Sequence, residues 1–242
     1  MNNKTKSSLY EIKVKSNNKE GLAQPPCVEN DILPKLPLGI LVCGKSGSGK
    51  TNAVVNIFSN EHLLKNHFAE VYLMTDTNPD KELIKDLKLK KENIIADFTE
   101  EQVKSIMDKN EKLIEQKGFS KSKSICLIFD DILSNQKFLK SRTATKLATA
   151  NRHYNISYIF CTQYFKKLPP VIRTNARYYI IFPSSMSEVE KLSDELCPAN
   201  MTKKEFIKYL QHATKERYSF LTINTESDCP LRRLFDNILL IK

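Results

Sequence analysis

The sequence is short of several features that would place it in other classes of protein. It has no tryptophan, only six glycines among 242 residues, and no apolar run long enough to form a membrane-spanning helix. Such a helix needs about 20 consecutive, mostly apolar residues, so we expect no membrane partner. The N-terminal stretch is basic but no apolar core follows it, so we also expect no secretory signal and a soluble intracellular protein.

Cysteine is present, but not in the patterns that bind metals or form disulfide frameworks. None of the six cysteines belongs to a Cys-x-x-Cys pair, and Cys43, Cys126 and Cys161 lie inside apolar runs. Cysteines in such runs are typical of small buried hydrophobes in a reducing compartment. We therefore expect neither a zinc site nor a disulfide.

The charge balance is strongly basic, with a formal net charge of +10. A charge of this size is typical of proteins that bind polyanions, nucleic acid first and a membrane surface second. A composition that is merely rich in lysine and asparagine would give the same balance. Charge alone therefore leaves both interpretations open.

The composition and hydrophobic pattern of the chain change near residue 36. Residues 1–35 are polar, rich in asparagine, lysine and serine, and end in a proline-containing stretch, which predicts a flexible basic arm. Residues 36–242 alternate short apolar runs with charged helical patterns and form the predicted globular domain. Within it, residues 184–242 are either a small C-terminal appendage or the last crossover and edge strand; we favour a single domain.

The alternation within the domain predicts an α/β fold. Apolar runs predict strands at 38–43, 69–75, 124–132, 156–163, 177–183 and 217–223. Helical patterns occupy 51–60, 79–89, 99–116, 135–154, 187–196 and 202–213, with Thr99 as the N-cap of the third helix. Because the strands are almost continuously apolar and are separated by helices, we expect a mostly parallel central sheet flanked by helices on both faces.

Glycine is concentrated in one place, where four of the six occur within eleven residues. Gly44, Gly49, Lys50 and Thr51 satisfy the pattern G-x-x-x-x-G-K-[ST], between a predicted strand and a predicted helix. Such a loop directs backbone N–H groups at phosphates on a helix N-terminus. Lys50 would reach the β- and γ-phosphates and the Thr51 hydroxyl would bind Mg²⁺. The residues expected to cradle the phosphates of ATP are Gly44, Lys45, Ser46, Gly47, Ser48, Gly49, Lys50 and Thr51.

Two carboxylates follow the apolar run at 125–129. Asp130 suits the acidic residue that holds Mg²⁺, and Asp131 would orient or deprotonate the attacking water. Taken alone, an apolar run followed by Asp-Asp is more often a strand that meets a surface turn. A phosphate-binding loop earlier in the chain favours the catalytic interpretation.

The apolar run at 156–162 ends in Gln163. In open parallel sheets ligands bind at the carboxyl ends of the strands, so Gln163 should face the same crevice as the phosphate-binding loop. We predict that it senses the γ-phosphate or the attacking water. An ordinary polar residue at the start of a loop is the alternative.

Several arginines surround these strands. An oligomeric nucleotide-hydrolysing enzyme often supplies an arginine across the subunit boundary, and Arg152 is the first candidate, followed by Arg173 and Arg142. The alternative is a solvated surface arginine. Lysines of the arm and three basic pairs could track DNA phosphates: Lys4, Lys6, Lys13, Lys15, Lys19, Lys166–Lys167, Lys203–Lys204 and Arg232–Arg233.

At this point the sequence resembles a known family, the poxvirus-type virion DNA-packaging ATPases of the FtsK–HerA superfamily. The segments that carry the resemblance are LVCGKSGSGKT, CLIFDDI and NRHYNISYIFCTQYFKKLPPVIRTNARYYIIF, within residues 36–183. It implies a RecA-like core, Mg²⁺-dependent ATP hydrolysis, and a pentameric or hexameric ring that threads double-stranded DNA into a capsid. A capsid portal or vertex protein would be a partner, and the viral factory in the host cytoplasm, or the virion, would be the location.

The same resemblance assigns the acidic pair to Asp130 and Asp131 and the strand-end glutamine to Gln163. The wider superfamily often has Asp-Glu at the acidic pair, whereas this chain has Asp-Asp. Three alternatives to the DNA motor remain at this stage: a nucleoside or small-molecule kinase, a GTPase-like switch, and a non-catalytic binding module. A kinase would need a lid with closely spaced arginines, and a GTPase would need a guanine-selecting motif that the sequence does not contain.

Overall fold

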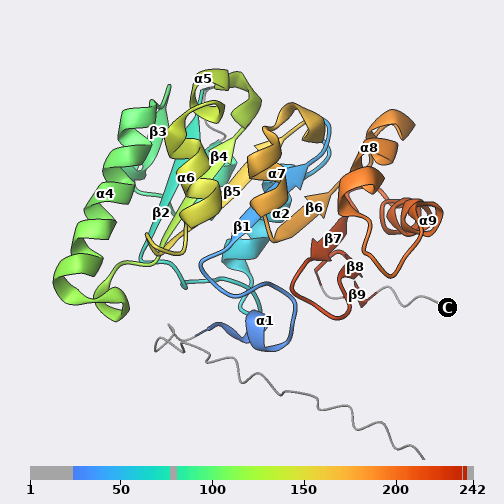
Figure 1. Cartoon of the computed structure of the whole chain (residues 1–242), viewed down its shortest axis with the longest axis horizontal. Helices are drawn as coiled ribbons and strands as arrows, with labels where there is room; N and C mark the ends of the chain where they lie inside the picture. Colours follow the sequence, from blue (N-terminus) through green and yellow to red (C-terminus); the bar gives the residue numbers. More distant parts are fainter. Residues whose placement is uncertain (1–23, 77–80, 236, 239–242) are drawn as a thin grey trace, which may run out of the picture.

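The computed structural model describes residues 24–76, 81–235 and 237–238 (Figure 1). Within these ranges the strands form one sheet with the order β3-β2-β4-β5-β1-β6-β7-β8-β9. The strands are β1 Gly39–Cys43, β2 Glu70–Thr75, β3 Ile94–Ala96, β4 Ile125–Asp130, β5 Ile156–Thr162, β6 Tyr178–Ile181, β7 Leu221–Asn224, β8 Leu231–Arg233 and β9 Asn237–Ile238. The six strands from β3 to β6 are parallel, and β7, β8 and β9 continue the sheet in antiparallel pairing. The predicted α/β fold with a mostly parallel sheet is confirmed.

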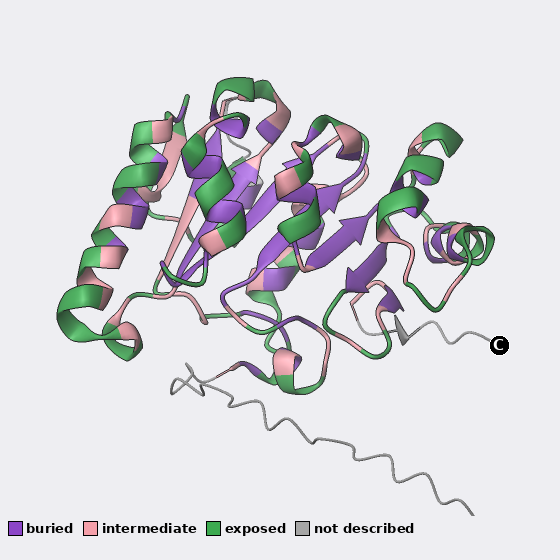
Figure 2. Ribbon diagram, viewed as in Figure 1, coloured by how far each residue is buried: buried purple, intermediate pink, exposed green. Residues whose placement is uncertain are grey.

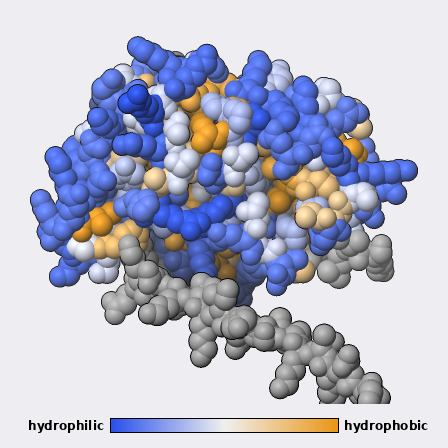
Figure 3. All heavy atoms as spheres, viewed as in Figure 1, coloured by the Kyte–Doolittle hydropathy of each residue, from blue (hydrophilic) through white to orange (hydrophobic). Residues whose placement is uncertain are grey.

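Helices cover both faces of the sheet (Figure 1). Their bounds are α1 Pro26–Glu29, α2 Lys50–Ser59, α3 Lys81–Asp86, α4 Glu100–Lys117, α5 Gln136–Leu139, α6 Arg142–Ala150, α7 Pro170–Asn175, α8 Met186–Leu196 and α9 Lys203–Ala213. One hydrophobic cluster contains residues of α4 to α9, and the other contains residues of α1, α2 and α3. The face viewed in Figure 3 is mostly hydrophilic, with apolar residues in small separate patches.

Alternate residues of each central strand enter opposite clusters. In β1, Leu41 and Cys43 face one cluster while Ile40 and Val42 face the other. Every residue of β1 and β5 is buried, as Figure 2 shows for the middle of the sheet. Burial on both faces explains why these strands are almost continuously apolar rather than alternating.

Cys43, Cys126 and Cys161, which lie in apolar runs, are buried as predicted. Cys27 is also buried, and no disulfide joins any of the described cysteines. Burial raises the pKa of Cys27 to about 11, so this thiol stays protonated at neutral pH.

Several predicted elements need correction. The single helix expected over 135–154 is two helices, because Asn135 caps α5 and Ser141 starts α6 by accepting a hydrogen bond from the Ala144 N–H. The strand expected over 217–223 begins only at Leu221. Three short strands were not predicted, since β3, β8 and β9 contain only two or three residues each. Thr99 does cap α4, in a capping box with Gln102.

The packed structure begins earlier in the chain than residue 36, the predicted start of the domain. Residues 1–23, which include the predicted basic lysines, lie outside the described residues. Cys27 and Leu33, by contrast, are 0% and 1% exposed and pack against the cluster beneath β1. Residues 24–35 are therefore part of the packed structure, and the flexible arm beyond them stays a prediction.

Candidate nucleotide-binding site

The glycine-rich loop joins β1 to α2, and its glycines are required by geometry. Gly47 and Gly49 have φ values of +72° and +101°, which side-chain-bearing residues rarely adopt. At Gly44 the constraint is space, because a Cβ there would lie 2.6 Å from the Phe182 Cβ. Gly49 also occupies the N-cap of α2 without any side-chain cap. The first N–H groups of α2 are thus left to bind an anion.

Lys50 and Thr51 are the first two residues of α2. The Lys50 ammonium donates hydrogen bonds to two carbonyls of the loop, Gly44 O at 2.8 Å and Lys45 O at 3.0 Å. These contacts hold the positive charge over the loop itself, where the phosphates of a nucleotide would lie. The Ser48 Oγ is buried and, among the described residues, finds no hydrogen-bond partner.

Strand order decides which side chains share this edge of the sheet. β5 lies between β1 and β4, and the register pairs Cys43 with Thr162 on one side of β5 and Phe129 with Phe160 on the other. All three strands are parallel, so the loop after β1, Gln163 after β5 and the end of β4 meet at the same carboxyl edge. The structure therefore brings together three of the predicted parts of the site, which are the glycine-rich loop, the acidic pair and Gln163.

The acidic pair occupies a sharp turn at the end of β4. Asp130 is the last residue of β4, and Asp131 has a left-handed backbone with φ 46° and ψ 47°. The Asp131 N–H donates to the Asp130 Oδ1 at 3.1 Å. A left-handed conformation at a non-glycine residue is uncommon and often occurs at functional sites.

Gln163 contacts the second carboxylate directly. Its Nε2 donates to the Asp131 Oδ1 at 3.5 Å, a long hydrogen bond that joins the ends of β5 and β4. The two strands also pack against each other close to these ends, because the Phe129 ring of β4 and the Phe160 ring of β5 have centroids 4.7 Å apart. Gln163 and Asp131 are thus neighbours on a rigid support, next to the phosphate-binding loop.

A third carboxylate at this edge was missed by the sequence reasoning. Asp76 follows β2, the neighbour of β4, and accepts hydrogen bonds from Ser134 Oγ at 2.9 Å and Asn135 Nδ2 at 3.3 Å. Ser134 Oγ also donates to the Asp131 carbonyl at 2.8 Å. Asp76 therefore braces the turn that carries the acidic pair. The available signal was the apolar run AEVYLMT, which ends directly before Asp76.

The charges of the site affect the thiol beneath it. Burial raises the pKa of Cys161 well above its usual value, and the charge of Asp130 raises it further, while Lys50 acts in the opposite direction. Cys161 lies on β5 and pairs with Val42 of β1, one residue before Thr162 and Cys43, the last residues of the two strands.

The site contains two oxygen-bearing side chains of the kind that bind Mg²⁺. Asp130 and the Thr51 hydroxyl offer the oxygen ligands that Mg²⁺ prefers. Across the described ranges, no group of three or more His, Cys, Asp or Glu side chains could hold a metal ion. Mg²⁺ usually binds through one or two carboxylates together with substrate phosphates, so this arrangement matches that pattern.

The structure places Arg152 away from the other predicted site residues. It precedes β5, at the amino edge of the sheet, whereas Gln163 follows β5. The seven residues of β5 separate these edges by roughly 20 Å. The Arg152 side chain is 64% exposed and lies 3.6 Å from Glu226 Oε1. Within its own chain Arg152 is therefore not part of the site; a role across a subunit boundary stays a prediction.

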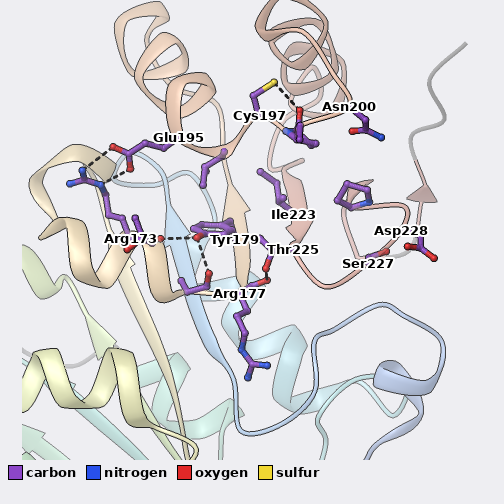
Figure 4. Close-up of a pocket in the computed structure, with 16 residues that line it drawn as sticks. Arg173, Arg177, Tyr179, Glu195, Cys197, Asn200, Ile223, Thr225, Ser227 and Asp228 are labelled. Carbon is purple, nitrogen blue, oxygen red and sulfur yellow. Dashed lines mark hydrogen bonds and ion pairs between the residues drawn. The ribbon is translucent and has the colours of Figure 1, made fainter. Parts of the chain in front are cut away.

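Arg173, the second arginine candidate, is bound within its own chain (Figure 4). Its Nε and Nη2 donate to the two carboxylate oxygens of Glu195 at 2.8 and 2.9 Å, and its side chain is only 10% exposed. It lines a cavity of about 660 Å³ at the amino edge, together with Tyr179, whose hydroxyl donates to the Arg173 carbonyl at 2.7 Å. Although this cavity is larger than the one beside the glycine-rich loop, it lies at the opposite edge from the nucleotide chemistry. We therefore interpret Arg173 as structural.

Most of the predicted basic pairs are also engaged. Lys166 pairs with Glu195, Lys203 with Asp194, and Arg233 with Glu216. Arg232 is only 5% exposed and donates to the Asp31 carbonyl at 2.9 Å. The expectation that Arg232 tracks DNA phosphates is wrong, because a buried guanidinium cannot follow a backbone in solution.

A smaller cavity, of about 310 Å³, adjoins the phosphate-binding loop. Its lining residues are Lys45, Ser46, Gly47, Ser48, Pro183, Ser184, Arg217 and Tyr218. It lies on the β6 side of the loop, opposite the side that carries Gln163 and the acidic pair. The glycine-rich loop thus has Gln163 and the acidic pair on one side and this cavity on the other.

A glycine-rich loop between a buried parallel strand and a helix, with carboxylates two strands away and a polar strand end between them, defines the class of RecA-like P-loop nucleoside triphosphatases. The chain belongs to the family described as Poxvirus A32 protein, whose profile it matches over residues 28–228. Over the part of the chain that the structure describes, no helix is long and apolar enough to cross a membrane.

Two curated viral proteins illustrate the relationship. A DNA packaging protein of vaccinia virus (strain Copenhagen) is 28% identical over 166 residues, which cover 66% of this chain and 58% of the relative. An uncharacterized protein of invertebrate iridescent virus 6 is 25% identical over 143 residues, covering 59% of this chain and 53% of that protein. The chain thus spans little more than half the length of the curated relatives that it matches.

A solved structure supports the fold across more of the chain. The genome packaging NTPase B204 from Sulfolobus turreted icosahedral virus 2, in complex with ATP-gammaS, matches with a TM-score of 0.57 and 18% identity. The match covers 84% of this chain and 98% of B204. At this level of identity the likeness establishes the fold, which agrees with the predicted RecA-like core.

Proposed function

We propose that this chain is an ATP-hydrolysing motor that moves double-stranded DNA into a viral capsid. The observation that carries the proposal is the placement of Gln163 between the phosphate-binding loop and the acidic pair, 3.5 Å from the Asp131 carboxylate. A polar group there can report the state of the γ-phosphate to the carboxylate that handles water. Membership of the Poxvirus A32 protein family and the packaging role named for the vaccinia relative support the same function.

In this proposal each residue of the site has one task. The N-terminus of α2 and the loop from Gly44 to Thr51 bind the phosphates, and Lys50 leaves its loop carbonyls to neutralise the β- and γ-phosphates. Asp131 orients the attacking water and accepts its proton, since its carboxylate is anchored by Gln163. Mg²⁺, held by Asp130 and Thr51 together with the phosphates, would neutralise charge that develops during hydrolysis.

The assembly and partners belong to the proposal as well. A ring of five or six copies, a capsid portal or vertex protein as docking partner, and a location in the viral factory or virion all follow from the packaging role. Arg152, exposed at the amino edge, is the proposed arginine that completes a neighbouring subunit's site. The net charge of +10 supports an encounter with DNA that weakens as salt increases.

The deciding experiment measures ATP hydrolysis with and without double-stranded DNA. We expect DNA to stimulate hydrolysis, and Lys50→Ala to abolish both basal and stimulated rates. Lys65→Ala is the matched control, because Lys65 lies beyond α2, outside the loop, and pairs with Glu61. Unchanged hydrolysis in DNA, together with transfer of the γ-phosphate to a small acceptor, would replace the motor with a kinase.

A further inference from the structure

The strand order fixes the direction in which a nucleotide must lie in the loop. Gln163 and the acidic pair follow β5 and β4, on one side of β1. The γ-phosphate must point to that side, because the groups that handle water are there. β6 lies on the other side of β1, so the ribose and base must extend toward the loops that flank β6 and β7.

The cavity of about 310 Å³ lies in that direction and is lined from two parts of the chain. One wall is the phosphate-binding loop from Lys45 to Ser48, and the other is formed by Pro183 and Ser184 after β6 and by Arg217 and Tyr218 before β7. Its volume is within the range of small-molecule sites. The cavity therefore continues the phosphate site toward the place where a base is expected.

Tyr218 is held in an unusual way for an aromatic residue. Tyr218 is 50% exposed, which is rare for a large hydrophobic residue among the described residues. Its backbone has a φ of +65°. It lies in a turn closed by the Ser219 N–H, which donates to the Glu216 carbonyl at 3.1 Å. A left-handed turn position normally favours glycine or asparagine, so the backbone of a tyrosine there is strained. Strain combined with exposure suggests a ligand contact rather than a packing role.

The ring of Tyr218 reaches the phosphate-binding loop itself. A Cβ placed on Gly49 would lie 3.4 Å from the Tyr218 Cδ1, so the ring borders the start of α2. The Arg217 guanidinium stacks on the same ring, 4.7 Å from its centroid. The pair thus presents a flat aromatic and cationic surface directly beside the loop.

We propose that Tyr218, supported by Arg217, is the platform on which the base of the nucleoside triphosphate stacks. The inference rests on the proposed nucleotide-binding function and adds the residues that recognise the base. Aromatic and guanidinium planes stack on nucleobases without needing a particular base edge. The platform therefore supplies affinity for a nucleoside triphosphate over a bare triphosphate.

The test compares two ligands on the full chain by calorimetry in Mg²⁺ buffer: ATP and inorganic tripolyphosphate. We expect the unsubstituted protein to bind ATP more tightly than tripolyphosphate. Tyr218→Asn removes the ring but keeps a residue that tolerates positive φ, and it should weaken ATP binding at least about fivefold without changing tripolyphosphate binding. Tyr218→Phe keeps the ring and should bind ATP as the unsubstituted protein does.

A matched control comes from Tyr164, which is 46% exposed and carries Lys167 over its ring at 4.5 Å, outside the cavity. Tyr164→Asn should leave the ratio of ATP to tripolyphosphate affinity unchanged. The inference is overturned if ATP binds no more tightly than tripolyphosphate to the unsubstituted chain, or if Tyr218→Asn weakens both ligands equally.

Failure of the motor proposal has a separate readout. Hydrolysis that DNA does not stimulate, with base-dependent ATP binding through Tyr218 intact, contradicts the motor and leaves the platform standing. DNA-stimulated hydrolysis with ATP affinity indifferent to Tyr218→Asn contradicts the platform and leaves the motor standing.

Discussion

Gln163 Nε2 lies 3.5 Å from Asp131 Oδ1, and this contact joins the end of β5 to the turn after β4. The two residues are 32 positions apart in the sequence and meet because their parallel strands are neighbours in the sheet. One of them adjoins the phosphate-binding loop and the other is the carboxylate proposed to handle water. In the proposed function, this contact would connect a change at the γ-phosphate to the attacking water.

The contact predicts that Gln163 and Asp131 act as a unit. Asp131→Asn should lower the turnover number for ATP hydrolysis by about 100-fold or more, since it removes the proton acceptor. Gln163→Ala should lower it less, and the double variant should be no slower than Asp131→Asn alone. Steady-state kinetics measures these rates, and binding of a non-hydrolysable ATP analogue is the control that should change little. Losses that multiply in the double variant would show that the two residues act independently.

The glycines of the loop predict two different kinds of defect. Gly44→Ala places a Cβ 2.6 Å from the Phe182 Cβ, so overpacking should lower the free energy of unfolding by about 1–3 kcal/mol. Gly47→Ala meets no atom within 4 Å, but its φ of +72° should cost about 1 kcal/mol. Urea denaturation measures both values. An equal or larger loss for Gly47→Ala would contradict the packing explanation for Gly44.

The phosphate-binding loop and the capped start of α4 were predictable because their causes are local. The loop pattern spans only eight residues, and Thr99 needs only Gln102 to cap its helix. The edge that Arg152 occupies was also predictable, because Arg152 precedes the strand that Gln163 follows and so lies at its opposite end. The grouping of Asp76 with the acidic pair was not predictable, because it depends on β2 lying beside β4 in the sheet.

The C-terminal part shows a second limit. The run RYSFLTI alternates like a strand, yet Tyr218 adopts a left-handed turn next to the loop after β1. Local pattern gives no hint of this, because the partner of the turn is more than 160 residues away in the sequence. Short strands such as β8 and β9 were not predicted for the same reason, because they are defined by the strands they pair with rather than by their composition.

The ion pair of Arg173 with Glu195 predicts a structural defect with a defined pH dependence. The hydrogen bond from Arg173 lowers the pKa of Glu195, burial opposes it, and the hydrogen bond from Lys166 lowers the pKa further. Because the pKa is lower in the folded state, the pair stabilises the fold above the unfolded pKa near 4.5. That stability is lost as pH falls through the folded value.

Glu195→Gln should therefore lower the free energy of unfolding by about 1–3 kcal/mol at pH 7, and the difference from the unsubstituted protein should shrink below about pH 4.5. Urea denaturation from pH 7 to pH 3 measures it. Lys166→Ala, which removes the more exposed partner, should cost less. A difference that stays constant with pH would exclude the ionised carboxylate as its origin.

Arg152 and Arg177 lie beside the same carboxylate, and their variants should separate a catalytic from a structural arginine. The Arg152 side chain is 64% exposed with one contact of 3.6 Å to Glu226, whereas the Arg177 side chain is 14% exposed and donates to the Lys35 carbonyl at 2.9 Å. Arg152→Ala should change the free energy of unfolding by less than about 0.5 kcal/mol. Arg177→Ala should lower it by about 1–3 kcal/mol, because the largely buried Arg177 side chain and its hydrogen bonds to Glu226 and to the Lys35 and Pro37 carbonyls are lost.

If Arg152 completes a neighbouring subunit's site, Arg152→Ala should also lower DNA-stimulated ATP hydrolysis by about a thousandfold in a protein that is otherwise as stable as the original. Mixing Arg152→Ala with Lys50→Ala should then restore part of the activity, because each assembly can contain an intact loop next to an intact arginine. A stable Arg152→Ala protein with full activity would remove this residue from catalysis and direct the search to other exposed arginines, of which Arg142 at the start of α6 is the next to test.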